Sequence, residues 1–227
     1  MNEILPIHVA IIMDGNRRWA KKHKVNPIEG HRKGVDTLIK IVEEAVRIGI
    51  KYLTVYALST ENLKNRTKSE VLALLKLIEE GFTKHLPRLK KEGARLNCIG
   101  DVKTLPISTQ MIINRAIDEL KGGKNVVITV AINYGGRDEI LRAANNLTVE
   151  KRPFSESQFE DQLYTAGMPD PNIVIRTGGH KRLSNFLLWQ SSYSELYFTD
   201  VLWPDFDAKE LGRAIKSLKT GVRNWGR

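Results

Sequence analysis

The sequence has a single cysteine and no apolar run long enough to cross a membrane. Cys98 cannot form a disulfide within the chain, and in the run RLNCIG we expect it to be a small core residue, not a nucleophile. The apolar run VVITVAI (126–132) has the length of a strand, whereas a membrane-spanning helix needs about 20 apolar residues. The first residues, MNEILPIHV, lack the basic flank and apolar stretch of a signal peptide. We therefore expect a cytoplasmic protein.

Motifs for zinc, nucleotides and nucleic acids are also missing. No Cys/His cluster has zinc-ligand spacing, and neither GxGxxG nor GxxxxGK[ST] occurs. Aromatic residues make up only 7% of the chain and do not alternate with basic residues, as a stacking surface for nucleic acid requires. The formal net charge of +10 still predicts an anionic partner, for which nucleic acid, an anionic membrane and a phosphorylated substrate all qualify. Of these three, the sequence least favours nucleic acid.

The order of apolar segments predicts one α/β domain over residues 1–227. The apolar content of 41% and charged content of 27% are those of a soluble globular protein. Strand patterns alternate with helical patterns, which favours a largely parallel central sheet with helices on both faces. The predicted strands are 8–14, 51–60, 95–101, 125–134 and 172–179. The predicted helices are 31–48, 69–92, 108–120 and 138–146, and we expect 149–170 to be the least ordered stretch.

Polar and basic residues directly follow four of these predicted strands. The segments are DGNRR after the first strand, STEN after the second, NYGGR after the fourth and RTGG after the fifth. Ligands of open α/β sheets bind outside the carboxyl ends of the strands. The sequence therefore predicts one anion-binding site at that edge of the sheet.

Asp14 is the natural metal ligand of this site. Gly15 lets the backbone approach a ligand closely, and Arg17 and Arg18 can donate charge-assisted hydrogen bonds to phosphate oxygens. A carboxylate beside a phosphate repels it unless a cation lies between them, and Mg²⁺ characteristically binds one or two carboxylates plus substrate phosphates. The alternative is that Asp14 is only the N-cap of a solvated basic helix.

A second concentration of basic residues is the segment RTGGHKRLSNF (176–186). Arg176, Arg182 and Ser184 could clamp a second phosphate group. The alternative is a turn with exposed basic residues, and this segment alone does not distinguish the two.

The predicted helix 69–92 has an unusually broad apolar face. Residues at i, i+3, i+4 and i+7 spacing are Val71, Leu74, Leu75, Ile78, Phe82 and Leu89, and Leu72, Ala73 and Leu77 widen this face. Burial in the core explains such a face by default. The other interpretation is one wall of an apolar tunnel beside the phosphate site, which suits a substrate with a charged head and a hydrocarbon tail.

These segments together resemble the cis-prenyltransferase family, most closely its bacterial undecaprenyl diphosphate synthases. The resemblance rests on HVAIIMDGNRRWA, YALSTEN, NYGGRDEI, RTGGHKRLSNFLLWQSSYSELYF and TDVLWPDF, and spans His8 to about Phe206. It implies a homodimeric, Mg²⁺-dependent enzyme that condenses isopentenyl diphosphate onto an allylic diphosphate such as farnesyl or geranylgeranyl diphosphate. The product would be a medium or long Z-polyprenyl diphosphate, and its hydrocarbon chain implies peripheral contact with a membrane.

The resemblance also implies roles for individual residues. Asp14 matches the essential carboxylate for metal and diphosphate, Glu195 a second metal-associated carboxylate, and Asn62 the position of a proposed proton acceptor. Because an amide is a very weak base, we expect Asn62 to orient a diphosphate oxygen that takes the proton. Arg66 and Glu70 match a segment that closes over the substrates. The positions implied to bind substrate are Gly15, Asn16, Arg17, Arg18, Trp19, His31, Ser59, Thr60, Glu61, Leu63, Arg66, Arg176, Arg182, Leu183 and Ser184.

Some positions depart from the family pattern. They are Pro27 for Arg, Leu58 for Phe, Leu63 for Trp, Lys181 for His and Asn224 for Arg. These changes leave substrate preference and metal geometry open, and they keep a non-catalytic subunit of a two-component prenyltransferase as an alternative. The other alternative is that the chain is a nucleic-acid-binding module. Small Ala57, where a bulky residue would block chain growth, favours a medium or long product.

Overall fold

Six parallel strands form the central sheet of this computed structural model, which describes residues 5–147 and 153–218. The strand order is β3-β4-β2-β1-β5-β6, and all neighbouring strands are parallel. The strands are β1 (His8–Ile12), β2 (Tyr52–Ser59), β3 (Ala94–Ile99), β4 (Val126–Tyr134), β5 (Ile173–Arg176) and β6 (Glu195–Phe198). The prediction of an α/β domain with a parallel sheet is confirmed.

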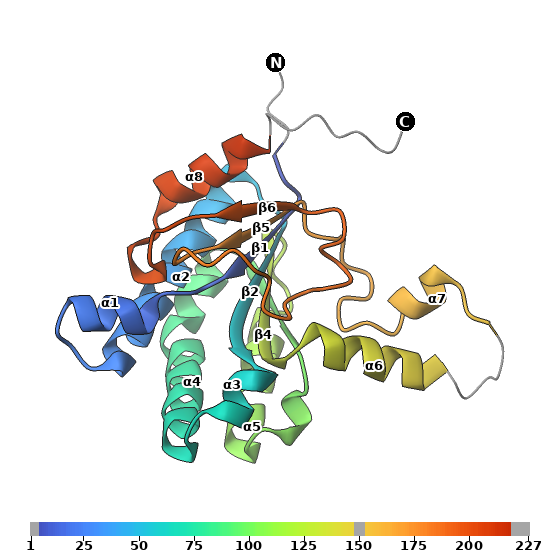
Figure 1. Cartoon of the computed structure of the whole chain (residues 1–227), viewed down its shortest axis with the longest axis horizontal. Helices are drawn as coiled ribbons and strands as arrows, with labels where there is room; N and C mark the ends of the chain where they lie inside the picture. The colour runs from blue at the N-terminus through green and yellow to red at the C-terminus, as the bar shows by residue number, and fades with distance from the viewer. Residues whose placement is uncertain (1–4, 148–152, 219–227) are drawn as a thin grey trace.

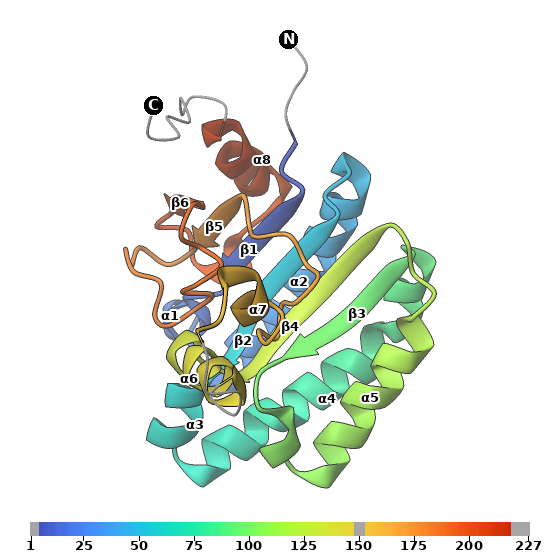
Figure 2. The ribbon, with the colours of Figure 1, turned by 90° about the vertical axis from the view of Figure 1, so that its right-hand side faces the viewer.

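Helices cover both faces of the sheet, as the sequence predicted (Figures 1 and 2). The helices are α1 (Asn16–Lys22), α2 (Pro27–Ile48), α3 (Thr60–Asn65), α4 (Lys68–Lys91), α5 (Ile107–Leu120), α6 (Gly136–Leu147), α7 (Glu156–Glu160) and α8 (Ala208–Ser217). Helices α2, α4, α5 and α8 bury their apolar residues against one face in the main core. On the other face, Phe186 and Leu187 pack against the strands, and α6 and α7 form a smaller cluster.

Capping residues explain where the two long helices begin. The Asn26 side chain accepts a hydrogen bond from Ile28 N, and Pro27 takes the first helical position, where its missing N–H costs nothing. Helix α2 therefore begins four residues before the predicted start. Thr67 and Glu70 form a capping box at the start of α4, within one residue of the predicted boundary.

The C-terminal third was predicted least well. Of the stretch expected to be least ordered, residues 149–152 lie outside the described residues, as does Asn224, whereas residues 153–170 are described and include a helix. Helix α7 lies in this stretch, and Phe159 is buried against α6. Strand β6 and helix α8 were not predicted.

Cys98 lies on β3, partly buried and packed against the main core. Burial raises the pKa of its thiol to about 12, so it stays protonated at neutral pH and is a poor nucleophile. Among the described residues, no helix is both long enough and apolar enough to span a bilayer.

Candidate active site

The register of the sheet brings the ends of β1, β2 and β5 together. Ile12 at the end of β1 pairs with Tyr56 of β2 and with Arg176 of β5. Segments that are far apart in the sequence therefore leave the sheet side by side, and the polar residues predicted to gather at this edge do so.

Asp14 lies between two arginines. Its Oδ2 accepts a hydrogen bond from Arg176 Nη2 at 3.0 Å, and its Oδ1 accepts one from Arg18 Nη2 at 3.1 Å. The N-cap of α1 is Gly15, at φ 118°, without a side-chain capping bond. The alternative in which Asp14 only caps a helix is therefore wrong. Its backbone carbonyl accepts from Thr177 Oγ1 and from Trp203 N, which fixes this turn to β5 and to the segment after β6.

Arg176 organises the loop that follows β5. Only 5% of the residue is exposed, and its Nη1 donates to the carbonyl of Arg182 at 2.6 Å and to Ser184 Oγ at 2.7 Å. For Arg176 the exposed-turn alternative is wrong, whereas Lys181 and Arg182 do have exposed side chains. The buried Arg176 Nε has no hydrogen-bond partner among the described residues.

A second group of basic residues, Arg17, His31 and Arg66, lines the same cavity as Asp14. Burial, followed by the charges of Arg66 and Arg17, lowers the pKa of His31 to about 4. Burial and the charge of Arg17 lower the pKa of Arg66, although Glu70 opposes this shift. The charge of Arg17 disfavours the charged form of Arg66, and an anion bound beside both guanidinium groups would offset that repulsion. This wall of the cavity therefore favours a multiply charged anion.

The start of α3 is held by Ser59 at the end of β2, by Asp138 of α6 and by Asn185 of the loop after β5. Ser59 Oγ caps α3 by accepting from Asn62 N, and Thr60 Oγ1 donates to Asp138 Oδ2 at 3.0 Å. Asn185 Nδ2 donates to Glu61 Oε1 at 2.8 Å. The sequence analysis named neither Asp138 nor Asn185 as part of the site, although Asp138 lies in the motif NYGGRDEI and Asn185 in the motif RLSNF.

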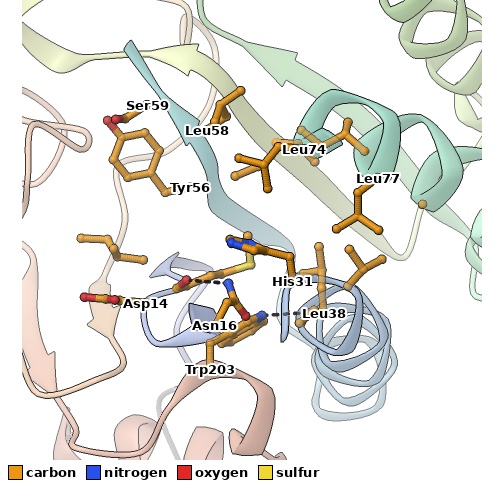
Figure 3. Close-up of a pocket in the computed structure, with 18 of the residues that line it drawn as sticks. Asp14, Asn16, His31, Leu38, Tyr56, Leu58, Ser59, Leu74, Leu77 and Trp203 are labelled. Carbon is orange, nitrogen blue, oxygen red and sulfur yellow. Dashed lines mark hydrogen bonds between the residues drawn. The ribbon is translucent and has the colours of Figure 1, made fainter. Parts of the chain in front are cut away.

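A cavity of about 690 Å³ extends from these polar residues between the sheet and helices α2 and α4. Figure 3 shows Asp14 and Ser59 at one side of it and Leu38, Leu74 and Leu77 at the other. Its apolar wall includes Val35, Leu38, Ile39 and Val42 of α2, Leu74, Leu77, Ile78, Phe82 and Leu89 of α4, and Leu96, Ile128 and Val130 of the sheet. The tunnel interpretation of α4 agrees with this cavity.

Individual predictions for the apolar face of α4 differ in outcome. Leu77 lines the cavity, but Leu72 is 59% exposed and Ala73 is also exposed, so these two residues do not widen the wall. The sequence did not indicate that residues of α2 line the cavity. A cavity wall and a core contact give the same periodicity, so the sequence could not separate them.

Most predicted substrate-site residues line this cavity. They are Asp14, Gly15, Asn16, Arg17, Arg18, His31, Ser59, Glu61, Asn62, Arg66, Arg176 and Ser184. The others, which do not line it, are Trp19, Thr60, Leu63, Arg182, Leu183 and Glu195. Trp19 Nε1 donates to Asp205 instead, and its ring stacks on His23.

Glu195 lies beside the first residue of β5, whereas Arg176 is the last residue of that strand. Glu195 is the first residue of β6 and pairs with Ile173, three residues before Arg176, which corresponds to about 10 Å along a strand. Within this chain the sheet therefore does not bring Glu195 to Asp14.

The donor set suits a Mg²⁺ ion that is shared with substrate phosphates. Among residues 5–147 and 153–218, no three His, Cys, Asp or Glu side chains form a group that could hold a metal ion. Asp14 supplies one carboxylate next to anion-binding arginines. Mg²⁺ commonly keeps several waters and binds one or two carboxylates plus phosphates. The single carboxylate of Asp14 fits such a site, whereas it would not by itself hold a metal that has only protein ligands.

Comparisons with known proteins agree with this geometry. A family model described as "Putative undecaprenyl diphosphate synthase" matches residues 12–226. The isoprenyl transferase of Clostridium perfringens is 43% identical over 98% of this chain and 90% of its own length, and that of Fusobacterium nucleatum is 44% identical over 100% and 98%.

Two solved structures share the fold over the full length of both chains. Lavandulyl diphosphate synthase from Lavandula x intermedia, in complex with dimethylallyl diphosphate, has a TM-score of 0.94 at 38% identity. A probable undecaprenyl diphosphate synthase from Campylobacter jejuni has a TM-score of 0.82 at 34% identity.

Proposed function

The chain belongs to the undecaprenyl diphosphate synthase family of prenyltransferases, and from this membership we propose that it condenses isopentenyl diphosphate with an allylic diphosphate. Farnesyl or geranylgeranyl diphosphate is the proposed starter. The proposed product is a medium or long Z-polyprenyl diphosphate.

The observation that carries this proposal is the composition of the cavity. Arginines and the carboxylates of Asp14 and Glu61 line one end of it, and aliphatic side chains of α2, α4 and the sheet line the rest. A prenyl diphosphate has the same division into a charged head and an apolar tail. Burial of the tail is favourable by roughly 0.8 kcal/mol for each methylene removed from water.

The two groups of cations support the binding of two diphosphates. We assign the allylic diphosphate to the side of Arg17, His31 and Arg66, and isopentenyl diphosphate to Arg176 and Ser184. The structural relative from Lavandula was solved with an allylic diphosphate, dimethylallyl diphosphate. Two sites in the same cavity would hold the reacting carbons close together, which lowers the barrier by orienting them.

In the proposed reaction the allylic carbon–oxygen bond breaks, and the leaving diphosphate takes the electron pair. The double bond of isopentenyl diphosphate attacks that carbon, and loss of a proton restores a double bond. Arginines aimed at the leaving group stabilise its developing charge without reorganising, which is commonly the largest catalytic contribution. We assign Asn62 to orienting the diphosphate oxygen that accepts the proton.

Asp14 is the residue we propose to hold Mg²⁺. When bound, this ion would neutralise charge on the departing diphosphate. A metal role for Glu195 stays a prediction. Glu195 is the first residue of β6 and lies at the opposite edge of the sheet from Asp14, so its position within one chain does not support this role.

Exposed apolar residues support the proposed partners. Tyr193 is 82% exposed and Leu196 of the edge strand β6 is 47% exposed, which suits a homodimer contact there. Leu72 and Met111 are exposed near the starts of α4 and α5, and Lys68 and Lys76 flank Leu72. Apolar side chains among lysines suit peripheral contact of a cytoplasmic enzyme with an anionic membrane.

The proposal is tested by incorporation of radiolabelled isopentenyl diphosphate with farnesyl diphosphate and Mg²⁺, comparing wild type with Asp14→Ala. We expect a long, butanol-extractable product that depends on Mg²⁺ and is abolished in the variant. If wild type makes no product from any allylic starter, the catalytic assignment is wrong. A non-catalytic subunit, or tight RNA binding without isopentenyl diphosphate binding, would then be the next hypothesis to test.

A further inference from the structure

The loop that carries Ser184 has an unusual backbone. Ser184, Asn185 and Leu187 all have positive φ, at 49°, 66° and 45°. Such values are uncommon for residues other than glycine, and among those residues asparagine is one of the most tolerant. Strained conformations of this kind persist where surrounding contacts hold them, and they cluster at functional sites.

Asn185 supplies those contacts with three hydrogen bonds. Its Oδ1 accepts from Arg137 N at 2.8 Å, its backbone carbonyl accepts from Gly136 N at 2.7 Å, and its Nδ2 donates to Glu61 Oε1 at 2.8 Å. The first two bonds attach the loop to the start of α6. The third attaches it to the start of α3.

Asn185 lines the cavity on one side, and on the other side it packs closely against Gly135. A Cβ atom on Gly135 would lie 2.7 Å from Asn185 Nδ2 and 2.8 Å from both Asp138 Oδ2 and Thr60 Oγ1. These two oxygens already share a hydrogen bond. Three segments that are distant in the sequence therefore meet at one point, and a shift of one of them displaces the other two.

We propose that Asn185 is a positioning residue that sets the distance between the two diphosphate sites. On one side its neighbour Ser184 accepts a hydrogen bond from buried Arg176. On the other, Glu61 and the adjacent Asn62 line the cavity from α3. The Asn185–Glu61 bond thereby connects the loop that binds the second substrate with the helix that meets the first. This role rests on the proposed condensation of two diphosphates.

The test reverses the direction of this bond. Asn185→Asp keeps the acceptor for Arg137 N but puts an oxygen opposite Glu61 Oε1. We expect kcat/KM for isopentenyl diphosphate to fall roughly 10- to 100-fold, the range that corresponds to losing a hydrogen bond to a charged group. We expect the Kd of the allylic starter, measured by calorimetry, to change by less than about 3-fold, which is smaller than the loss of one hydrogen bond to a charged group would cause. In the double variant Asn185→Asp/Glu61→Gln, the new amide can donate to the new carboxylate, and we expect most of the loss to be recovered.

Asn133→Asp is the matched control. Asn133 also has positive φ, at 50°, and its Nδ2 donates to the carbonyl of Asp101 and to Thr104 Oγ1, but it does not line the cavity. We expect this variant to lose thermal stability and to keep wild-type KM values.

Three outcomes would overturn the proposal. They are unchanged kinetics in Asn185→Asp, a double variant no better than Asn185→Asp alone, and equal loss of binding for both substrates together with a lower melting temperature. The last would mean that Asn185 only stabilises the loop. Each comparison starts from an active wild type, so failure of the proposed reaction itself would be seen first and separately.

Discussion

Arg176 Nη2 lies 3.0 Å from Asp14 Oδ2 and joins the ends of the adjacent strands β5 and β1. The guanidinium side chain is only 6% exposed, whereas the carboxylate is 26% exposed and faces the cavity. The ion pair therefore orients Asp14 toward the site and gives a buried cation its counter-charge. A metal ion or diphosphate that enters the cavity meets a carboxylate already held in place.

Asp14→Asn is expected to retain the fold and to lose at least about 100-fold in kcat, because removing one preorganised electrostatic group typically costs that much. It is also expected to lower the free energy of unfolding by about 1–3 kcal/mol, since Arg176 loses its charged partner. Steady-state kinetics and urea titration measure the two effects. Asp205→Asn is the matched control, because Asp205 accepts from Trp19 outside the cavity and its replacement should leave kcat near wild type. Near-wild-type activity of Asp14→Asn would contradict its proposed role.

Ala57→Leu is expected to shorten the product, because Ala57 lines the cavity and a larger side chain occupies space that the growing chain needs. Product lengths are read by chromatography of the dephosphorylated polyprenols. Ala73→Leu adds the same atoms at an exposed position of α4 and should leave the length distribution unchanged. A wild-type product of only two or three isoprene units would already show that Ala57 does not permit long chains.

Gly34→Ala is expected to destabilise the protein and to disturb the site together. A Cβ atom there would lie 2.5 Å from Asn16 Oδ1 and 2.9 Å from the ring of buried Trp203, whose Nε1 donates to the Gly34 carbonyl. Overpacking of this kind costs about 1–3 kcal/mol. Thermal unfolding and kcat/KM are the measurements. Gly212→Ala on α8, with nothing within 4 Å of the new atom, should instead stabilise by up to about 1 kcal/mol. Equal behaviour of the two variants would argue against steric conflict at Gly34.

The free energy of unfolding is expected to fall as the pH falls from 6.5 to 4. Burial lowers the pKa of His8 to about 4, and its ring bonds to the Pro169 carbonyl and to Thr54 Oγ1. In this window the unfolded chain binds the proton and the folded chain does not, so acid favours unfolding by up to about 3 kcal/mol. Urea titrations at several pH values measure the slope. His8→Gln should reduce the slope but not abolish it, because burial also lowers the pKa of His31 to about 4. An unchanged slope in His8→Gln would assign the pH dependence to other groups.

Local pattern was sufficient where an element is long or fully buried. The apolar residues 9–12 of β1 and the capping box of α4 specify their elements without reference to distant residues. Strand β6 was not predicted because its four residues are exposed or partly exposed and lack the apolar pattern of a buried strand. The site was predicted to a similar extent. Most residues named in the segments after β1, β2 and β5 line the cavity, whereas none of NYGGR does, and the lining residues Trp203 and Asn185 were not named.

The sequence by itself determined the chemistry of this protein, because it places a carboxylate, arginines and hydroxyl groups directly after buried strands, and parallel strands end at one edge. The tertiary structure decided which of those groups meet. Strand register pairs Arg176 with Ile12 and places Glu195 at the opposite end. The orientation of α4 against the sheet decides that Leu77 lines the cavity and that Leu72 is exposed. Contacts between segments more than a hundred residues apart, such as Asn185 with Glu61, depend on the summed geometry of every intervening element, and no local pattern records it.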